Sequence, residues 1–208
     1  MLKIFAALTL LILTTVGAAA APVTILALGD SLTAGQGLVL AEGFPARLEA
    51  ALKAKGHDVK VINAGVSGDT AADGAARLDW ALAEPVNAVI VELGANDALR
   101  GLPVAQAEQA LNQLLTALEQ KKLPTLLAGM KAPPNMGADY QTQFEGMYQR
   151  LAAKHPTVLV YPFFLDGVAA DPKLNQDDGI HPNAAGVDVI VARMLPSVEQ
   201  LLGKAAGN

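Results

Sequence analysis

Cysteine is absent from all 208 residues of the sequence. Its absence excludes disulfide bonds, thiolate metal sites, a cysteine nucleophile and a lipid-modified N-terminal cysteine. Serine and histidine are scarce as well, since each occurs only three times. Any serine–histidine chemistry must therefore be sought among six residues, namely Ser31, Ser67, Ser197, His57, His155 and His181.

Aromatic residues and positive charge are also in short supply. Phe, Trp and Tyr make up 4% of the chain, and 15 Lys and Arg are outnumbered by 20 Asp and Glu, for a net charge of −5. A mildly acidic chain without a basic cluster offers no surface for nucleic acid or an anionic membrane. The hydrophobic fraction of 52% is enough for a substantial core, and the abundance of alanine makes that core aliphatic.

The first twenty residues have the composition of a secretory signal peptide. Lys3 supplies a positive charge, an apolar run follows over residues 4–13, and small residues lead to Ala20. A basic start, an apolar centre and an Ala-x-Ala exit predict cleavage after Ala20. A membrane anchor is the alternative, but spanning a bilayer takes about 20 apolar residues. We expect a signal peptide over 1–20, a single domain over 21–208, and a periplasmic or secreted mature protein without a stable membrane anchor.

Short apolar, β-branched runs alternate with amphipathic segments along the remaining chain. Most runs are apolar throughout, as in strands that are buried on both faces. The alternation predicts a three-layer α/β/α architecture, in which helices cover both sides of an open, five-stranded parallel sheet. The predicted strands are Val23–Leu28, Val59–Asn63, Ala88–Leu93, Thr125–Ala128 and Val158–Tyr161. The predicted helices are about Pro45–Lys55, Ala71–Ala83, Pro103–Leu118, Tyr140–Lys154 and Pro182–Leu202.

Ligand sites in such sheets lie beyond the carboxyl ends of the strands, so reactive residues should follow strands. Ser31 directly follows the first predicted strand, after a glycine that permits a tight turn. His181 follows the fifth strand, whereas His57 and His155 precede strands at the opposite end. Asp178, three residues before His181, is placed to hold the imidazole Nδ1–H and leave Nε2 free to take the serine proton. Taken alone, these features also fit a turn serine and an acidic loop with a helix-capping histidine.

Two further loops could supply donors to the oxyanion that forms during acyl transfer. Gly68 lies in a glycine-bearing loop after the second strand, where a backbone N–H can approach a substrate closely. Asn96 brings a side-chain amide after the third strand. Alone, these residues equally fit a turn glycine with positive φ and an asparagine that closes a strand-to-helix turn. The specific signal is the occurrence of all four elements together and in order.

These four elements together resemble the SGNH (GDSL-type) hydrolase superfamily. Its blocks correspond here to residues 29–32 (Gly-Asp-Ser-Leu), 66–69 (Val-Ser-Gly-Asp), 94–97 (Gly-Ala-Asn-Asp) and 178–181 (Asp-Gly-Ile-His). The longer stretches 91–101 and 176–183 are similar to the bacterial periplasmic branch of thioesterase I, lysophospholipase L1 and arylesterase. The resemblance covers the chain from about Val23 to Leu202.

The resemblance implies a flavodoxin-like SGNH hydrolase fold and a serine ester hydrolase that cleaves carboxylic esters or thioesters through an acyl-Ser31 intermediate. It implies that Asp178 and His181 complete the triad, and that the oxyanion hole consists of the Ser31 and Gly68 N–H groups and the Asn96 side chain. Neither a metal nor an organic cofactor is expected. The expected partner is a small-molecule acyl ester or thioester, and the protein is expected to be a monomer.

The loop that follows the fourth predicted strand, residues 131–140, matches the substrate loop of that branch only in part. Two prolines and a glycine disfavour regular structure there, and the loop follows the strand on the active side. We expect it to form a mobile wall of the acyl site, with Met136 and Tyr140 touching the acyl chain. The alternative is an ordinary surface loop.

Other functions fit parts of the pattern. A carbohydrate O-acetyl esterase would use the same triad, and a non-catalytic exported binding domain would keep the same fold. A nucleotide- or phosphate-binding domain also begins with a glycine loop, but residues 35–37 (Gly-Gln-Gly) lack the third glycine and no G-x-x-x-x-G-K-[ST] occurs. The α/β-hydrolases are disfavoured, because neither Ser31 nor Ser67 lies in a G-x-S-x-G context.

Overall fold

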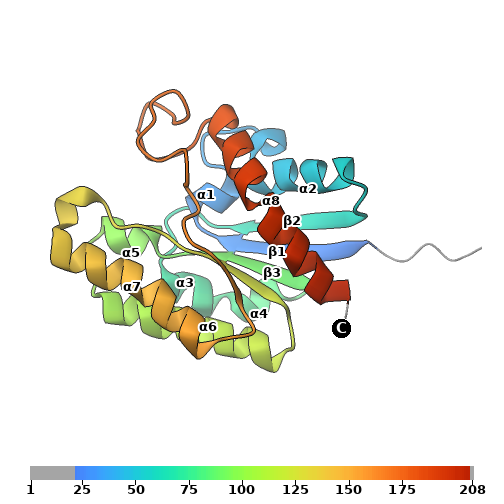
Figure 1. Ribbon diagram of the computed structural model, residues 1–208, viewed down its shortest axis with the longest axis horizontal. Coiled ribbons are helices and arrows are strands. Elements are labelled where there is room, and N and C mark those ends of the chain that lie inside the picture. The colour runs from blue at the N-terminus through green and yellow to red at the C-terminus, as the bar shows by residue number, and fades with distance from the viewer. Residues whose placement is uncertain (1–21, 207–208) are drawn as a thin grey trace, which may run out of the picture.

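Five parallel strands form the centre of the computed structural model, which describes residues 22–206 (Figure 1). The predicted signal peptide and its cleavage site after Ala20 lie outside the described residues. Within residues 22–206, no helix is both long enough and apolar enough to cross a membrane. The strands are β1 (Val23–Gly29), β2 (Val59–Gly65), β3 (Ala88–Glu92), β4 (Thr125–Ala128) and β5 (Leu159–Tyr161).

Seven α-helices and two 3-10 helices lie in the connections between the strands, and an eighth α-helix follows β5, within the described part of the chain. The longer α-helices are α2 (Phe44–Ala54), α6 (Val104–Gln120), α7 (Ala138–Lys154) and α8 (Ala184–Ala206). The short ones are α1 (Ser31–Ala34), α3 (Ala71–Ala76), α4 (Leu78–Ala81) and α5 (Ala95–Leu99). The 3-10 helices are η1 (Leu40–Glu42) and η2 (Pro134–Met136).

The strand order is β2-β1-β3-β4-β5, with every pair parallel. This is the flavodoxin-like order, in which the chain leaves β1 for one side and β3 continues on the other. Such a reversal opens a crevice beyond the carboxyl ends of β1 and β3. The register pairs Gly29 at the end of β1 with Gly65 of β2 and Glu92 of β3. The three strands therefore end level with one another beneath that crevice.

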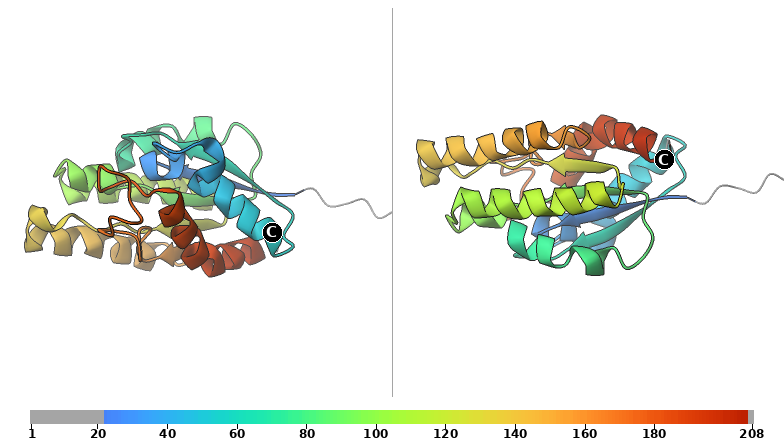
Figure 2. Two further views of the ribbon diagram at one scale, coloured as in Figure 1. Left: turned by 90° about the horizontal axis from the view of Figure 1, so that it is seen from above. Right: turned by 90° about the horizontal axis from the view of Figure 1, so that it is seen from below.

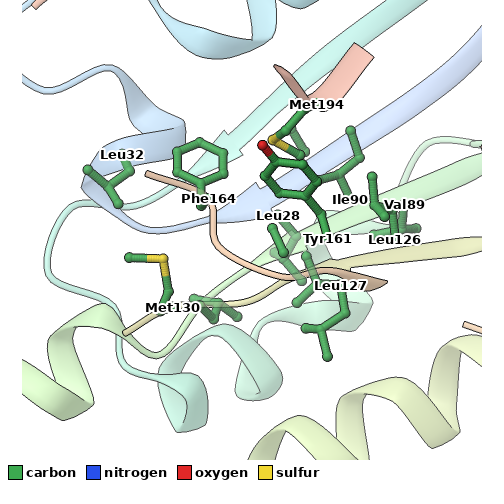
Figure 3. Close-up of a cluster of buried hydrophobic side chains, with 14 of the residues drawn as sticks. Leu28, Leu32, Val89, Ile90, Leu126, Leu127, Met130, Tyr161, Phe164 and Met194 are labelled. Carbon is green, nitrogen blue, oxygen red and sulfur yellow. The ribbon is translucent and has the colours of Figure 1, made fainter. Parts of the chain in front are cut away.

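Helices cover both faces of the sheet, which confirms the predicted three-layer α/β/α class. Helix α2 packs against α8 on one face, while α3, α6 and α7 form the opposite layer. The two layers are seen from above and below in Figure 2. The central strands β3 and β4 are buried along their whole length, as is β1 from Ile25 onward, whereas Lys60 and Asn63 of the edge strand β2 are exposed. The cluster in Figure 3 joins strand residues such as Leu28 and Leu127 to Met194 of α8.

Two helices differ from the sequence prediction. The stretch expected as one helix over Ala71–Ala83 forms α3 and α4, separated at Arg77. It contains Gly74, which has low helix propensity but lets the helix approach Leu93. The last helix begins at Ala184 instead of Pro182, because Pro182 pairs with Asn175 in an isolated β-bridge.

Candidate active site

The turn after β1 places Ser31 at the start of α1. Asp30 caps this helix, since its Oδ1 accepts a hydrogen bond from the Leu32 N–H at 2.9 Å. Gly29 ends β1, and a Cβ at that position would lie only 2.7 Å from Glu92 Oε2. The glycine and the cap turn the chain sharply at the carboxyl edge of the sheet. Ser31 there lines a cavity.

A continuous hydrogen-bonded chain joins Ser31, His181 and Asp178. His181 Nε2 lies 2.8 Å from Ser31 Oγ, and His181 Nδ1 lies 2.6 Å from Asp178 Oδ2. Asp178 Oδ1 accepts the backbone N–H groups of Ile180 and His181, each at 3.0 Å. The hydrogen bonds from His181 and Ile180 lower the pKa of Asp178 to about 2, so it remains an anion that accepts the Nδ1–H. Nε2 is then free to accept the Ser31 proton.

The backbone of the loop before α8 holds this acid and base next to each other. The bridge between Asn175 and Pro182 closes the loop, and the Gln176 N–H donates to the His181 carbonyl at 2.8 Å. Gly179 at the tip has a φ of +74°, a conformation that glycine adopts without steric cost. The three-residue spacing noted in the sequence is thus converted into side-chain contact by a closed turn.

Gly68 and Asn96 lie on the same cavity as Ser31. Gly68 has a φ of +90°, and Asn96 is in the first turn of α5. The Asn96 amide nitrogen donates to Asp30 Oδ2 and to the Asp69 carbonyl, both at 3.0 Å. An amide nitrogen has only two hydrogens, so each is already engaged within the protein. Asn96 must release or share one of these bonds before it can donate to another group.

The cavity beside these residues has a volume of about 570 Å³ and a largely apolar wall. Leu32 and Met130 belong both to this wall and to the buried cluster in Figure 3. No cluster of His, Asp or Glu that could hold a metal ion is present in the described part of the chain. The apolar lining residues are Leu32, Leu99, Met130, Ala132, Pro133, Pro134, Phe163, Leu165, Ala169, Ala170 and Ile180.

Comparison with known proteins decides the family. The model of the GDSL-like lipase/acylhydrolase family matches residues 27–189. The chain belongs to this family. It is 41% identical to esterase TesA from Pseudomonas aeruginosa over 88% of this chain and 91% of that protein. It is 39% identical to thioesterase 1/protease 1/lysophospholipase L1 from Escherichia coli, over 92% of this chain and 90% of that protein.

A solved structure supports the same membership. The SGNH-hydrolase family esterase AlinE4 is 46% identical and superposes with a TM-score of 0.74, covering 89% of this chain and 99% of that one. The predicted superfamily and fold are therefore confirmed, and so is the predicted enzyme class. The protein is a carboxylic ester hydrolase that acts on small-molecule esters.

Met136 and Tyr140, which the sequence predicts to touch the acyl chain, are not among the residues that line the cavity of this GDSL-like hydrolase. Met136 Cε packs toward Gly101, where an added Cβ would lie 2.9 Å away. The Tyr140 hydroxyl donates to the Leu102 carbonyl at 2.8 Å, and its ring stacks on Phe144. The two residues fasten the loop to neighbouring segments, and the part of the loop that lines the cavity is 131–134.

Sequence reasoning missed other cavity residues of this hydrolase. Leu99 projects from the end of α5 with 48% of its surface exposed, and Phe163 and Leu165 follow β5. A signal was present, because three large apolar residues at 163–165 come directly after the last strand, on the same edge as the other polar loops.

Proposed function

We propose that this ester hydrolase uses Ser31 as nucleophile, His181 as general base and Asp178 as the carboxylate that orients the base. In this mechanism His181 Nε2 removes the Ser31 proton as Oγ attacks the substrate carbonyl. The ester alcohol or thiol leaves with that proton, and an acyl-Ser31 intermediate remains. Water, activated by the same imidazole, then releases the acid. The observation that carries this assignment is the 2.8 Å contact between Ser31 Oγ and His181 Nε2 at the edge of a cavity.

The proposed oxyanion hole consists of the backbone N–H groups of Ser31 and Gly68 and the side chain of Asn96. Fixed donors at this point would stabilise the negative charge that develops on the carbonyl oxygen. Two arguments support the assignment: these residues share one cavity, and they come from three different connections, after β1, β2 and β3, which meet at the carboxyl edge of the sheet.

We propose that the substrates have an extended acyl chain and are esters or thioesters of the aryl ester, lysophospholipid or acyl thioester type. A largely apolar cavity of about 570 Å³ favours such a chain, because burying each methylene group contributes about 0.8 kcal/mol. Burying the hydroxyl groups of a sugar against this largely apolar wall would leave them without hydrogen-bond partners, which argues against a carbohydrate O-acetyl esterase. A non-catalytic binding role is disfavoured by the hydrogen bonds that link Ser31, His181 and Asp178, because binding alone does not require a base next to a serine hydroxyl.

The nucleophile is tested with a serine-reactive phosphonate probe and with nitrophenyl esters of increasing acyl length. The phosphonate should label Ser31 in the wild type and fail to label Ser31→Ala. That variant should lose at least about three decades in kcat, with an unchanged circular dichroism spectrum. Retention of most of the activity in Ser31→Ala would disprove the assignment, and a maximum at acetate would disprove the acyl-chain proposal.

We also propose that the protein is exported by its N-terminal segment, cleaved after Ala20, and acts as a monomer in the periplasm or outside the cell. The charge and apolar pattern of residues 1–20 supports export. N-terminal sequencing of the protein from a periplasmic or culture fraction, together with its elution volume in size exclusion, tests both statements. A retained Met1 in that fraction, or a dimer mass, would contradict them.

A further inference from the structure

Glu92 is an acidic residue at the end of a strand that is otherwise apolar. Its side chain is completely buried, and its backbone pairs in register with Gly29. Oε2 accepts the Thr33 hydroxyl at 2.8 Å and, more weakly, the Asp30 N–H at 3.4 Å. No N–H or O–H group in the described part of the chain donates to Oε1, but the carboxyl groups of Glu92 and Asp30 hydrogen-bond to each other. The mechanism above assigns no role to this carboxyl group.

Asp30 links Glu92 to the proposed reaction centre. This side chain is also fully buried, and its two oxygens are used differently. Oδ1 caps α1 through the Leu32 N–H, and Oδ2 accepts the Asn96 amide at 3.0 Å. Asp30 therefore fixes the helical turn that begins at Ser31 and the amide that we place in the oxyanion hole.

Two buried carboxyl groups in contact cannot both remain charged without a large free-energy cost. Burial raises the pKa of Asp30 to about 6, but N–H donors and a hydrogen bond with Glu92 favour its anion. Burial, and then the charge of Asp30, raise the pKa of Glu92 well above its usual range. Glu92 is therefore the protonated partner, and its hydrogen has the Asp30 carboxylate as an acceptor.

We propose that Glu92 is a positioning residue for ester hydrolysis: its neutral carboxyl group donates to the Asp30 carboxylate, and Asp30 then holds the Asn96 amide and the first turn of α1. Gly29 fits this role, because a Cβ there would overlap Thr33 Oγ1 and crowd Glu92 Oε2. The inference rests on the proposed roles of Ser31 and Asn96. It adds a buried acid that touches no substrate and acts through its neighbour.

The proposal explains why the acid must be neutral and a donor. If Glu92 were replaced by an apolar residue, the buried Asp30 carboxylate would lose a hydrogen bond that stabilises its negative charge. Asp30 would then take up a proton more readily. A protonated Asp30 is a poorer acceptor for the Asn96 amide, which would then reorient. Loss of orientation at an oxyanion donor acts on the transition state, so it lowers kcat more than it raises KM.

The test compares Glu92→Gln with Glu92→Leu. Glutamine keeps an oxygen for Thr33 and an N–H for Asp30, whereas leucine keeps only the volume. We expect Glu92→Gln to stay within about threefold of the wild-type kcat on one nitrophenyl ester, and Glu92→Leu to lose about tenfold or more at similar KM. Glu119→Leu is the matched control, since it removes an acid at the opposite end of the sheet. It should leave kcat unchanged even if it lowers the melting temperature.

The infrared spectrum gives a readout that does not depend on activity. A buried protonated carboxyl group should absorb in the wild type at neutral pH, and this band should be missing from Glu92→Gln.

The proposal is overturned if the band is absent from the wild type, or if Glu92→Gln loses as much activity as Glu92→Leu. Equal kcat for leucine and wild type also overturns it. Should Glu92→Leu fail to fold, the band and the glutamine kinetics still decide. Failure of the proposed function would appear separately, as an unlabelled Ser31 in the wild type.

Discussion

The two ends of the sheet each carry a histidine bound to a carboxylate. At the carboxyl end, His181 Nδ1 lies 2.6 Å from Asp178. At the amino end, His155 Nδ1 lies 2.8 Å from Glu119. Both imidazole rings are largely buried, with side-chain exposures of 11% and 4%. Judged by the acid–base pair alone, either histidine could belong to a hydrolytic triad.

The second ring nitrogen separates them. His181 Nε2 faces the hydroxyl of Ser31, which lines the apolar cavity, whereas His155 Nε2 faces the side-chain oxygen of Asn112 at 3.1 Å. An amide oxygen has no proton to give to a base. His155 therefore ties α7 to α6, and only His181 is placed to activate a nucleophile. A histidine–carboxylate contact is thus insufficient evidence of catalysis without a nucleophile on the other side of the ring.

Replacing each histidine by glutamine should give the largest effects, on kcat for His181 and on the free energy of unfolding for His155. We expect His181→Gln to lose at least about 10³-fold in kcat, because no base remains for Ser31. His155→Gln should keep kcat and lose about 1–3 kcal/mol of unfolding free energy, since Glu119 or Asn112 loses a buried partner. Steady-state kinetics and urea unfolding measure the two effects. A large loss of kcat in His155→Gln would contradict the purely structural role that we assign to His155.

Neutralising two adjacent acids tests the orienting role of Asp178. Asp178→Asn would present an NH₂ group to Nδ1 and favour the wrong tautomer, a change that cost about 10⁴ in kcat in a serine protease. We expect about two to three decades here, because the Asp178 side chain is 44% exposed and the loop can partly reorient. Asp177→Asn is the matched control. Asp177 is exposed, so kcat/KM should remain within a few-fold of wild type. If Asp177→Asn were the more damaging change, the orienting acid would be Asp177.

Removing the Asn96 side chain should lower kcat less than His181→Gln or Asp178→Asn does. Loss of one oxyanion donor typically costs about 10²–10³ in kcat. Both amide hydrogens of Asn96 are engaged by Asp30 and Asp69, so donation to the substrate must compete with these bonds. We expect Asn96→Ala to lower kcat by about ten- to a hundredfold with little change in KM. An effect confined to KM would make Asn96 a substrate-positioning group instead.

Much of the fold and of the candidate site was predictable from sequence, for a physical reason. Strands buried on both faces are continuous apolar runs, and parallel strands bring the loops that follow them to one edge. Ser31, Gly68, Asn96 and His181 could therefore be grouped without knowledge of the strand order. The three-residue spacing of Asp178 and His181 required only a tight turn.

The parts that could not be predicted depend on register and packing. Glu92 meets Asp30 because β1 and β3 pair with Gly29 opposite Glu92, and nothing in either segment alone specifies that pairing. The available signal was an acidic residue within the otherwise apolar stretch Ala88–Leu93. Residues 131–140, predicted as a loop, contain η2 and the first turn of α7. Their path depends on the contacts of Met136 and Tyr140 with the segment after α5, which their own sequence does not encode.

Substitutions in the cavity wall should have the smallest effect on activity, and they test which residues contact the acyl chain. Leu99 lines the cavity and Met136 does not, although Pro134 of the same 3-10 helix does. Truncating a side chain that contacts the acyl chain forfeits roughly 0.8 kcal/mol for each methylene contact. We expect Leu99→Ala to lower kcat/KM for long nitrophenyl esters by about three- to tenfold relative to short ones. Met136→Ala should leave the acyl-length profile unchanged. If Met136→Ala shifted the acyl-length profile and Leu99→Ala did not, Met136 and not Leu99 would contact the acyl chain.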